Sequence, residues 1–194
     1  MALQLDTGGR PLEKIHIGGI CASRNPTVVR TILGSCIAVC LRDPINRVGG
    51  MNHFMLPDCA TGGLDSACYG VHSMELLINA CMRQGAQRNA LEAKVFGGGH
   101  VLKMRETDNN VPQSNIRFTI DFLMTEGIPV IAKDVGGYAA RELYFFTDTF
   151  KTLMKRMAET GLNNEDMQEL ESEQAQFARQ KAVPDPKDDD ITLF

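Results

Sequence analysis

The stretch Thr31-Ile-Leu-Gly-Ser-Cys-Ile-Ala-Val-Cys-Leu-Arg-Asp-Pro-Ile-Asn-Arg-Val-Gly-Gly-Met-Asn-His-Phe-Met-Leu-Pro57 decides how this chain folds. Two apolar segments in it are separated by Asp43-Pro44-Ile45-Asn46, and Asp and Pro are residues that favour turns. The pattern therefore predicts a β-hairpin of two antiparallel strands. If the turn is centred between Pro44 and Ile45, residues whose numbers sum to 89 face each other.

Cys36 and His53 meet that condition. Directly opposed residues of an antiparallel pair hold their Cβ atoms about 4.5–5.5 Å apart, which is close enough for a thiol and an imidazole to share a proton. The pairing predicts a nucleophilic cysteine activated by a histidine. A bulge at Gly49-Gly50 would shift this register. The alternative is that Cys36 and Cys40 are small buried hydrophobic residues of a core strand, and composition alone favours that alternative.

The composition is that of an ordinary globular protein. With 194 residues, 43% of them hydrophobic and 23% charged, the chain can form one domain with a sizeable core and an appendage. The net charge of -4 argues against nucleic acid or an anionic membrane as the main partner. No leader pattern begins the chain, and no apolar run approaches the roughly 18 residues of a membrane span. We therefore expect a cytoplasmic protein.

Six cysteines stand at positions 21, 36, 40, 59, 68 and 81, and none of them forms a Cys-x-x-Cys motif. This spacing is typical neither of a disulfide framework nor of a structural zinc site. We expect reduced thiols, and neither a metal nor another cofactor.

Helical and strand patterns surround the hairpin. Apolar residues at i, i+3, i+4 spacing predict two amphipathic helices, one closed by Gly85 and the other by Gly127, with apolar faces made of Val71, Met74, Leu77, Ile78, Cys81 and Met82, and of Ile116, Ile120, Leu123 and Met124. Further strands are expected at Ile15–Ile20, Ala93–Phe96, Ile128–Val135, Glu142–Thr147 and Phe150–Met154. Hairpins mixed with two helices predict an α/β fold, a single-domain sandwich of mixed β-sheets flanked by helices.

Two connecting segments bear on the surroundings of the predicted Cys36–His53 pair. Gly97-Gly98-Gly99 follows a predicted strand, as phosphate-binding loops do, but neither a Lys-Ser/Thr pair nor a complete dinucleotide fingerprint accompanies it. We expect instead a close backbone approach, either to the active site or to a packed neighbour. The loop at 58–69 follows His53 and is either a lip of a substrate groove or a solvated connector.

The segments Thr-x-Leu-Gly-Ser-Cys at 31–36 and Gly-Gly-Met-x-His-x-x-Leu-Pro at 49–57 resemble those of the chemoreceptor glutamine deamidase family, CheD. The likeness continues through Tyr69-Gly70, Gly85-Ala86, Ala93-Lys-Val-Phe-Gly-Gly98 and Ile128-Pro-Val-Ile-Ala-Lys-Asp-Val-Gly-Gly137, and so covers roughly residues 12–156. One segment departs from the family. Val111-Pro112-Gln-Ser-Asn115 stands where CheD proteins usually carry Gly-x-Arg-Asn, and only Asn115 is shared.

The resemblance implies a Cys-His-Thr triad. Cys36 would be the nucleophile and His53 the base and then the acid, while Thr31 would accept from the far ring nitrogen, with Thr27 as the alternative. The backbone N–H of Cys36 is the expected oxyanion donor. Residues expected at the substrate are Gly34, Ser35 and Phe96. The implied fold is similar to that of bacterial deamidating-toxin cysteine hydrolases.

The implied activity is hydrolysis of glutamine side chains of methyl-accepting chemoreceptors to glutamate, with release of ammonia through a thioester acyl-enzyme. The same chemistry would accept a glutamyl methyl ester. The implied partners are the cytoplasmic helices of the receptors and a CheC-type phosphatase. Two alternatives are a non-catalytic adaptor that binds the receptors or the phosphatase, and a hydrolase of small molecules with a deep, closed pocket.

The expected domain organisation has three parts. Residues 1–11 form a loose lead-in, residues 12–156 the deamidase-like domain, and residues 157–194 a polar helix and an acidic flexible tail.

Overall fold

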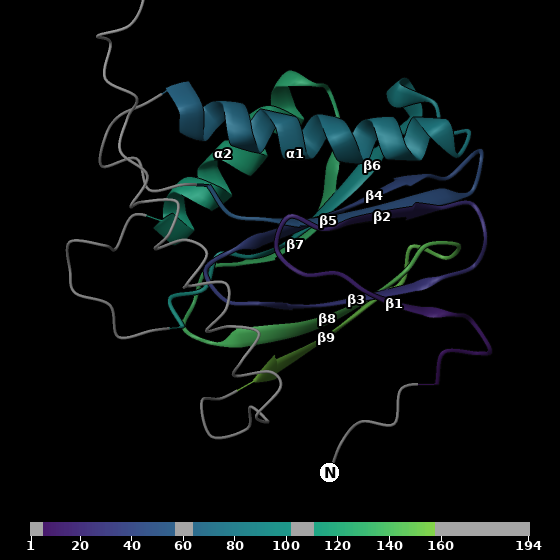
Figure 1. Ribbon diagram of the computed structural model, residues 1–194, viewed down its shortest axis with the longest axis horizontal. Coiled ribbons are helices and arrows are strands. Elements are labelled where there is room, and N and C mark those ends of the chain that lie inside the picture. The colour runs from purple at the N-terminus through teal and green to yellow at the C-terminus, as the bar shows by residue number, and fades with distance from the viewer. Residues whose placement is uncertain (1–5, 57–63, 102–110, 158–194) are drawn as a thin grey trace, which may run out of the picture.

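The computed structural model describes residues 6–56, 64–101 and 111–157. Two β-sheets pack face to face, and both helices lie on the outer side of the five-stranded sheet (Figure 1). The strand order is β1-β3-β8-β9 in the four-stranded sheet and β2-β5-β4-β6-β7 in the five-stranded sheet. The predicted α/β sandwich of mixed sheets with flanking helices is confirmed.

The strands are β1 (Leu12–Lys14), β2 (Ile20–Ser23), β3 (Val28–Leu33), β4 (Ile37–Asp43), β5 (Val48–Phe54), β6 (Glu92–Gly97), β7 (Val130–Val135), β8 (Ala140–Phe146) and β9 (Thr152–Met157). The helices are α1 (Leu64–Arg83) and α2 (Val111–Thr125), with a short 3-10 helix at Arg88–Ala90. In the part of the chain that the structure describes, no helix is both long and apolar enough to cross a membrane.

The predicted hairpin exists as β4 and β5, but its register differs from the expected one. Asp43 pairs with Val48, so four residues form the turn, and facing residue numbers sum to 91 instead of 89. Asp43 holds this turn, because its Oδ1 accepts from the N–H groups of Ile45 and Asn46 at 2.8 and 2.9 Å. The ladder runs without a shift through Gly49 and Gly50, so a bulge is not the cause. The longer turn moves the register.

A second correction concerns the first strand of the predicted hairpin. β3 ends at Leu33 and β4 begins at Ile37, and the two strands belong to different sheets. The three residues Gly34, Ser35 and Cys36, here called the crossing turn, carry the chain from the four-stranded to the five-stranded sheet. A glycine and two small residues suit such an abrupt change of direction. Cys36 therefore lies where the two sheets meet.

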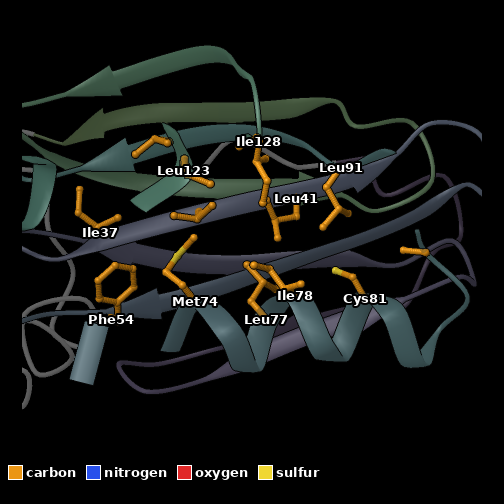
Figure 2. Close-up of a cluster of buried hydrophobic side chains, with 14 of the residues drawn as sticks. Ile37, Leu41, Phe54, Met74, Leu77, Ile78, Cys81, Leu91, Leu123 and Ile128 are labelled. Carbon is orange, nitrogen blue, oxygen red and sulfur yellow. The ribbon is translucent and has the colours of Figure 1, made fainter. Parts of the chain in front are cut away.

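The five-stranded sheet is covered on both faces. On its helix side Leu41 packs with Met74, Leu77 and Ile78 of α1, and all four are fully buried (Figure 2). Each such side chain stabilises the fold by about 1.5–3 kcal/mol. Successive side chains of a strand point to opposite faces of the sheet. The strand residues next to those of this layer therefore point toward the four-stranded sheet. This apolar layer offsets the cost of the polar groups buried between the sheets.

The helix ends follow from the glycines that were expected to close them. Gly85 has a φ of +101°, and its N–H bonds to the carbonyl of Met82 while the N–H of Ala86 bonds to that of Cys81. This pair of bonds is a Schellman motif, in which a left-handed residue satisfies the last carbonyls of a helix. α2 ends in the same way at Gly127, with a φ of +67°. Both predicted ends are confirmed.

Some local predictions are wrong. Residues 15–19 are not a strand, because Gly18 adopts a φ of +80° and the N–H of Gly19 bonds back to the carbonyl of His16. α1 begins at Leu64, so the loop predicted at 58–69 is shorter, and residues 57–63 lie outside the described residues. Met124 is 72% exposed and does not belong to the buried face of α2. In contrast, the strands predicted near 93–96, 128–135, 142–147 and 150–154 are found as β6 to β9.

The expected end segments are described only in part. Residues 1–5 and 158–194 lie outside the described residues, so the polar helix and acidic tail stay a prediction. Within the lead-in, Arg10 donates from Nε and a terminal nitrogen to the carboxylate of Asp148 at 3.0 and 2.8 Å. This ion pair attaches the lead-in to the loop between β8 and β9.

Candidate active site

Three side chains from three parts of the fold meet between the two sheets. Cys36 lies in the crossing turn, His53 on β5 of the five-stranded sheet, and Thr31 on β3 of the four-stranded sheet. The Sγ of Cys36 lies 2.8 Å from Nε2 of His53, and Nδ1 of His53 lies 2.8 Å from Oγ1 of Thr31. All three residues are fully buried. The structure thus brings together the three residues that the resemblance assigned to a triad.

Cys36 and His53 meet although they are not directly opposed in the hairpin. His53 faces Ala38, and Cys36 precedes Ala38 by two residues. Because side chains alternate with a period of two, a register error of two residues leaves both groups on the same side of the sheet. Diagonal neighbours in a regular ladder have Cα atoms about 7–8 Å apart, which is within reach of a long side chain such as histidine. The Nε2 nitrogen of His53 thus reaches the Sγ of Cys36, which lies in the crossing turn just before β4.

The direction of the hydrogen bonds fixes the tautomer of His53. The Thr31 hydroxyl donates its one hydrogen to the carbonyl oxygen of Ile15 at 2.8 Å, so its oxygen accepts toward His53. Nδ1 of His53 must then carry the hydrogen, and Nε2 presents its lone pair to the Cys36 thiol. An imidazole in this state can accept the thiol proton.

Ile15 is a contributor that the sequence patterns did not identify. Its carbonyl orients the Thr31 hydroxyl, and its own N–H donates to the carbonyl of Arg30 at 3.0 Å. A backbone carbonyl can come from any residue type, so no side-chain motif marks it. The backbone turn after β1 places it here.

Thr27, the alternative triad member, lies elsewhere. Its hydroxyl donates to the carbonyl of Asn25 at 3.0 Å and lies 3.4 Å from the hydroxyl of Ser23. The structure therefore brings Thr31, and not Thr27, to the histidine.

The three residues expected at the substrate lie around Cys36. Gly34 and Ser35 belong to the crossing turn, and the Ser35 hydroxyl lies 3.5 Å from Sδ of Met55. Phe96 pairs with Ala38 and is 7% exposed, as part of the apolar cluster between the sheets. Their contact with a substrate stays a prediction.

The glycine cluster at the end of β6 supports the crossing turn directly. The N–H of Gly98 donates to the carbonyl of Cys36 at 2.7 Å, and the N–H of Gly99 donates to the carbonyl of Gly34 at 2.8 Å. Gly97 has a φ of +115°, and a Cβ at this position would collide with the carbonyl oxygen of Cys36. The predicted close backbone approach is confirmed, and the neighbour is the candidate active site.

Substitution Gly97→Ala should therefore damage both stability and activity. The left-handed φ and the collision with the Cys36 carbonyl together are expected to lower the free energy of unfolding by about 2 kcal/mol or more. Gly127→Ala is the matched control, because Gly127 also has a positive φ but nothing lies within 4 Å of an added Cβ. Urea titration and activity assays of both variants measure the difference. Equal effects on activity would contradict the supporting role of Gly97.

The other buried thiols lie in a different electrostatic environment. Burial raises the pKa of the Cys40 thiol, and the nearby charge of Lys94 offsets only part of this rise. Burial also raises the pKa of the Cys81 thiol to about 12. Both groups are therefore protonated and unreactive at neutral pH. Within residues 6–56, 64–101 and 111–157, no three His, Cys, Asp or Glu side chains gather closely enough to hold a metal ion.

Selective alkylation would test this contrast. Cys36, Cys40 and Cys81 are equally buried, but only Cys36 has an imidazole nitrogen 2.8 Å from its sulfur. An imidazolium stabilises an adjacent thiolate, so Cys36 should react with iodoacetamide below pH 7 faster than the other two. Peptide mapping after brief treatment gives the rate at each site. His53→Ala should remove the preference for Cys36, and its persistence in that variant would contradict the pairing.

Comparisons with known proteins decide the family. A family model described as CheD chemotactic sensory transduction matches residues 55–156. This range begins two residues after His53, so it does not include the three side chains described above. A Shewanella oneidensis protein named "Probable chemoreceptor glutamine deamidase CheD 1" is 43% identical over 189 residues, which cover 95% of this chain and 88% of that protein. The chain belongs to the CheD family.

Further CheD relatives match over similar lengths. A protein from Rhizobium rhizogenes named "Probable chemoreceptor glutamine deamidase CheD" is 44% identical over 94% of this chain and 96% of its own length. One of the same name from Thiobacillus denitrificans is 42% identical over 88% of this chain and 85% of its own length.

Among solved structures, hypothetical protein YfiH of Bacillus licheniformis superposes with a TM-score of 0.42 and 12% identity over 68% of this chain and 65% of that one. A likeness at that TM-score has no bearing on function.

Proposed function

We propose that this CheD protein hydrolyses glutamine side-chain amides of chemoreceptors to glutamate and ammonia. The observation that carries the proposal is the chain of hydrogen bonds from Ile15 through Thr31 and His53 to Cys36, which leaves a basic nitrogen 2.8 Å from a thiol. The names of the curated relatives supply the substrate class.

In the first half of the reaction, Nε2 of His53 takes the proton of the Cys36 thiol. The thiolate attacks the carbonyl carbon of the glutamine side chain, and a carbon–sulfur bond forms. The imidazolium then gives its proton to the amide nitrogen, the carbon–nitrogen bond breaks, and ammonia leaves. A thioester between Cys36 and the substrate remains.

In the second half, His53 takes a proton from water, and the resulting hydroxide attacks the thioester carbon. The carbon–sulfur bond breaks and the proton returns to sulfur, which yields glutamate and regenerates the thiol. The backbone N–H of Cys36 is proposed to donate to the oxyanion in both halves, a contribution of about 10²–10³ in rate for one well-aimed donor. Thr31 acts by holding the ring of His53 and its tautomer.

The same acyl-enzyme would form from a glutamyl methyl ester, with methanol in place of ammonia as the leaving group. We therefore include methylesterase activity in the proposal. The proposal also includes a fold similar to that of bacterial deamidating-toxin cysteine hydrolases, as the family resemblance implies. The proposed partners are cytoplasmic receptor helices and a CheC-type phosphatase. A non-catalytic adaptor for the same partners is the second hypothesis, and the intact arrangement of Cys36, His53 and Thr31 favours the enzyme.

Mass spectrometry of receptor cytoplasmic fragments incubated with the protein tests the proposal. The expected result is a Gln-to-Glu mass shift at defined positions, together with ammonia release, and neither with the Cys36→Ala variant. Fragments that bind the protein and stay unmodified would favour the adaptor. Hydrolysis of free glutamine or other small amides, with receptor fragments untouched, would favour a small-molecule hydrolase.

A further inference from the structure

Asn115 of α2 bridges the two chain segments that carry Cys36 and His53. Its side chain is fully buried and donates from Nδ2 to the carbonyl of Ser35 at 2.9 Å. Its Oδ1 accepts from the N–H of Leu56 at 2.7 Å. Ser35 directly precedes Cys36, and Leu56 follows His53 by three residues. One amide group thus contacts both segments.

The bridge lies where the β4–β5 ladder stops. The last pair of that ladder is Ile37 with Phe54, and the same register, in which numbers sum to 91, would pair Ser35 with Leu56. The Asn115 amide takes the place of a direct hydrogen bond from the N–H of Leu56 to the carbonyl of Ser35. The two segments are therefore held apart by the width of one amide group, and they stay connected across it.

We propose that Asn115 is a positioning residue that sets the distance between the Cys36 thiol and the His53 imidazole. The inference deepens the proposed function and rests on it. The side-chain amide of Asn115 bonds to backbone groups, and it acts through the backbone of the crossing turn and of the segment after β5. The Sγ–Nε2 distance of 2.8 Å joins groups on these two segments, so a change in their separation changes it directly.

The position of Asn115 is itself constrained by the packing of α2. The Thr119 hydroxyl donates to the backbone carbonyl of Asn115 at 2.7 Å, but this bond lies within one turn of α2 and involves neither segment. A Cβ at Gly98 would lie 2.5 Å from Cγ1 of Ile116, so α2 lies against the glycine cluster that supports Cys36. A helix held in this way can act as a rigid reference for the two segments.

Only a carboxamide suits this place at neutral pH. It offers one donor to a carbonyl and one acceptor to an N–H, whereas an ionised carboxylate has no donor for the Ser35 carbonyl and repels it. A protonated carboxyl group restores both bonds, because its O–H donates and its carbonyl oxygen accepts. Substitution Asn115→Asp therefore makes the position sensitive to pH, and burial favours the neutral form of the introduced acid.

The experiment compares Asn115→Ala, Asn115→Asp and the control Thr119→Val with the wild type, on a receptor fragment across a range of pH. For Asn115→Ala we expect kcat to fall about 10²-fold at every pH, with a smaller change in KM, because a small misplacement of reacting groups costs that much. For Asn115→Asp, kcat relative to wild type should rise as pH falls. Thr119→Val removes a buried hydrogen bond of the same helix and should stay near wild type.

A second readout does not depend on the substrate. The rate of Cys36 alkylation at pH 6–7 should fall in Asn115→Ala and stay unchanged in Thr119→Val, even if the receptor fragment proves not to be a substrate. If the wild-type protein leaves glutamine amides intact, the proposed function is overturned and the positioning role is not. If Asn115→Ala has the same kcat and the same rate of Cys36 alkylation as the wild type, the positioning role is overturned. If Asn115→Ala does not fold, the folded Asn115→Asp variant decides. A ratio of its kcat to the wild-type kcat that does not change with pH would overturn the positioning role.

Discussion

Cys36→Ala is expected to remove deamidation and leave the protein folded. The sulfur forms the acyl bond in the proposed mechanism, and it lies 2.8 Å from the Nε2 nitrogen of His53 that takes its proton. We expect a loss of about 10⁴-fold or more in kcat, the scale that follows when a covalent nucleophile is deleted. Deletion of one sulfur atom should lower the free energy of unfolding by only about 1–2 kcal/mol.

The matched control for this variant is Cys40→Ala. Cys40 is equally buried in the same layer between the sheets, but it lies within β4 opposite Met51, in an environment that raises the pKa of its thiol. It should retain activity at a similar cost in stability. Ammonia release and urea titration on the two variants separate chemistry from folding. Wild-type ammonia release by Cys36→Ala would rule out the covalent mechanism.

His53→Ala is expected to be nearly as damaging as the loss of Cys36, because proton transfer to and from this ring is needed in both halves of the reaction. General acid–base groups contribute about 10²–10⁴ in rate, and here the same ring also activates the nucleophile. Thr31→Val should be milder, since it removes the acceptor that orients the ring and leaves the ring in place. Thr31→Ser keeps the hydroxyl between Ile15 and His53 and should restore much of the activity.

Single-turnover rates on a receptor fragment rank these variants. The expected order of activity is wild type, Thr31→Ser, Thr31→Val and then His53→Ala. The rate of Cys36 alkylation should follow the same order, because the thiolate depends on the same imidazole. Negligible effects of both His53→Ala and Thr31→Val would contradict the triad.

Local sequence signals determined a large share of this fold. Alternation and turn residues predicted the hairpin, and Gly85 and Gly127 predicted the helix ends, because a left-handed residue at a helix end is a local steric requirement. The pairing of Cys36 with His53 survived a wrong register, because an error of two residues preserves the face of the sheet. The choice of Thr31 came from the family resemblance, since the residues alone did not exclude Thr27.

The assembly of the site depends on tertiary contacts that no local pattern predicts. The change of sheet at the crossing turn, the carbonyl of Ile15 and the amide of Asn115 all depend on contacts between segments far apart in the chain. Backbone carbonyls carry no sequence signal. The family resemblance marked Asn115, but its bonds depend on the partners that the other segments bring to it. The sequence patterns together with the family resemblance therefore identified the side chains that could react, whereas the packing of two sheets and a helix sets the distances at which they meet.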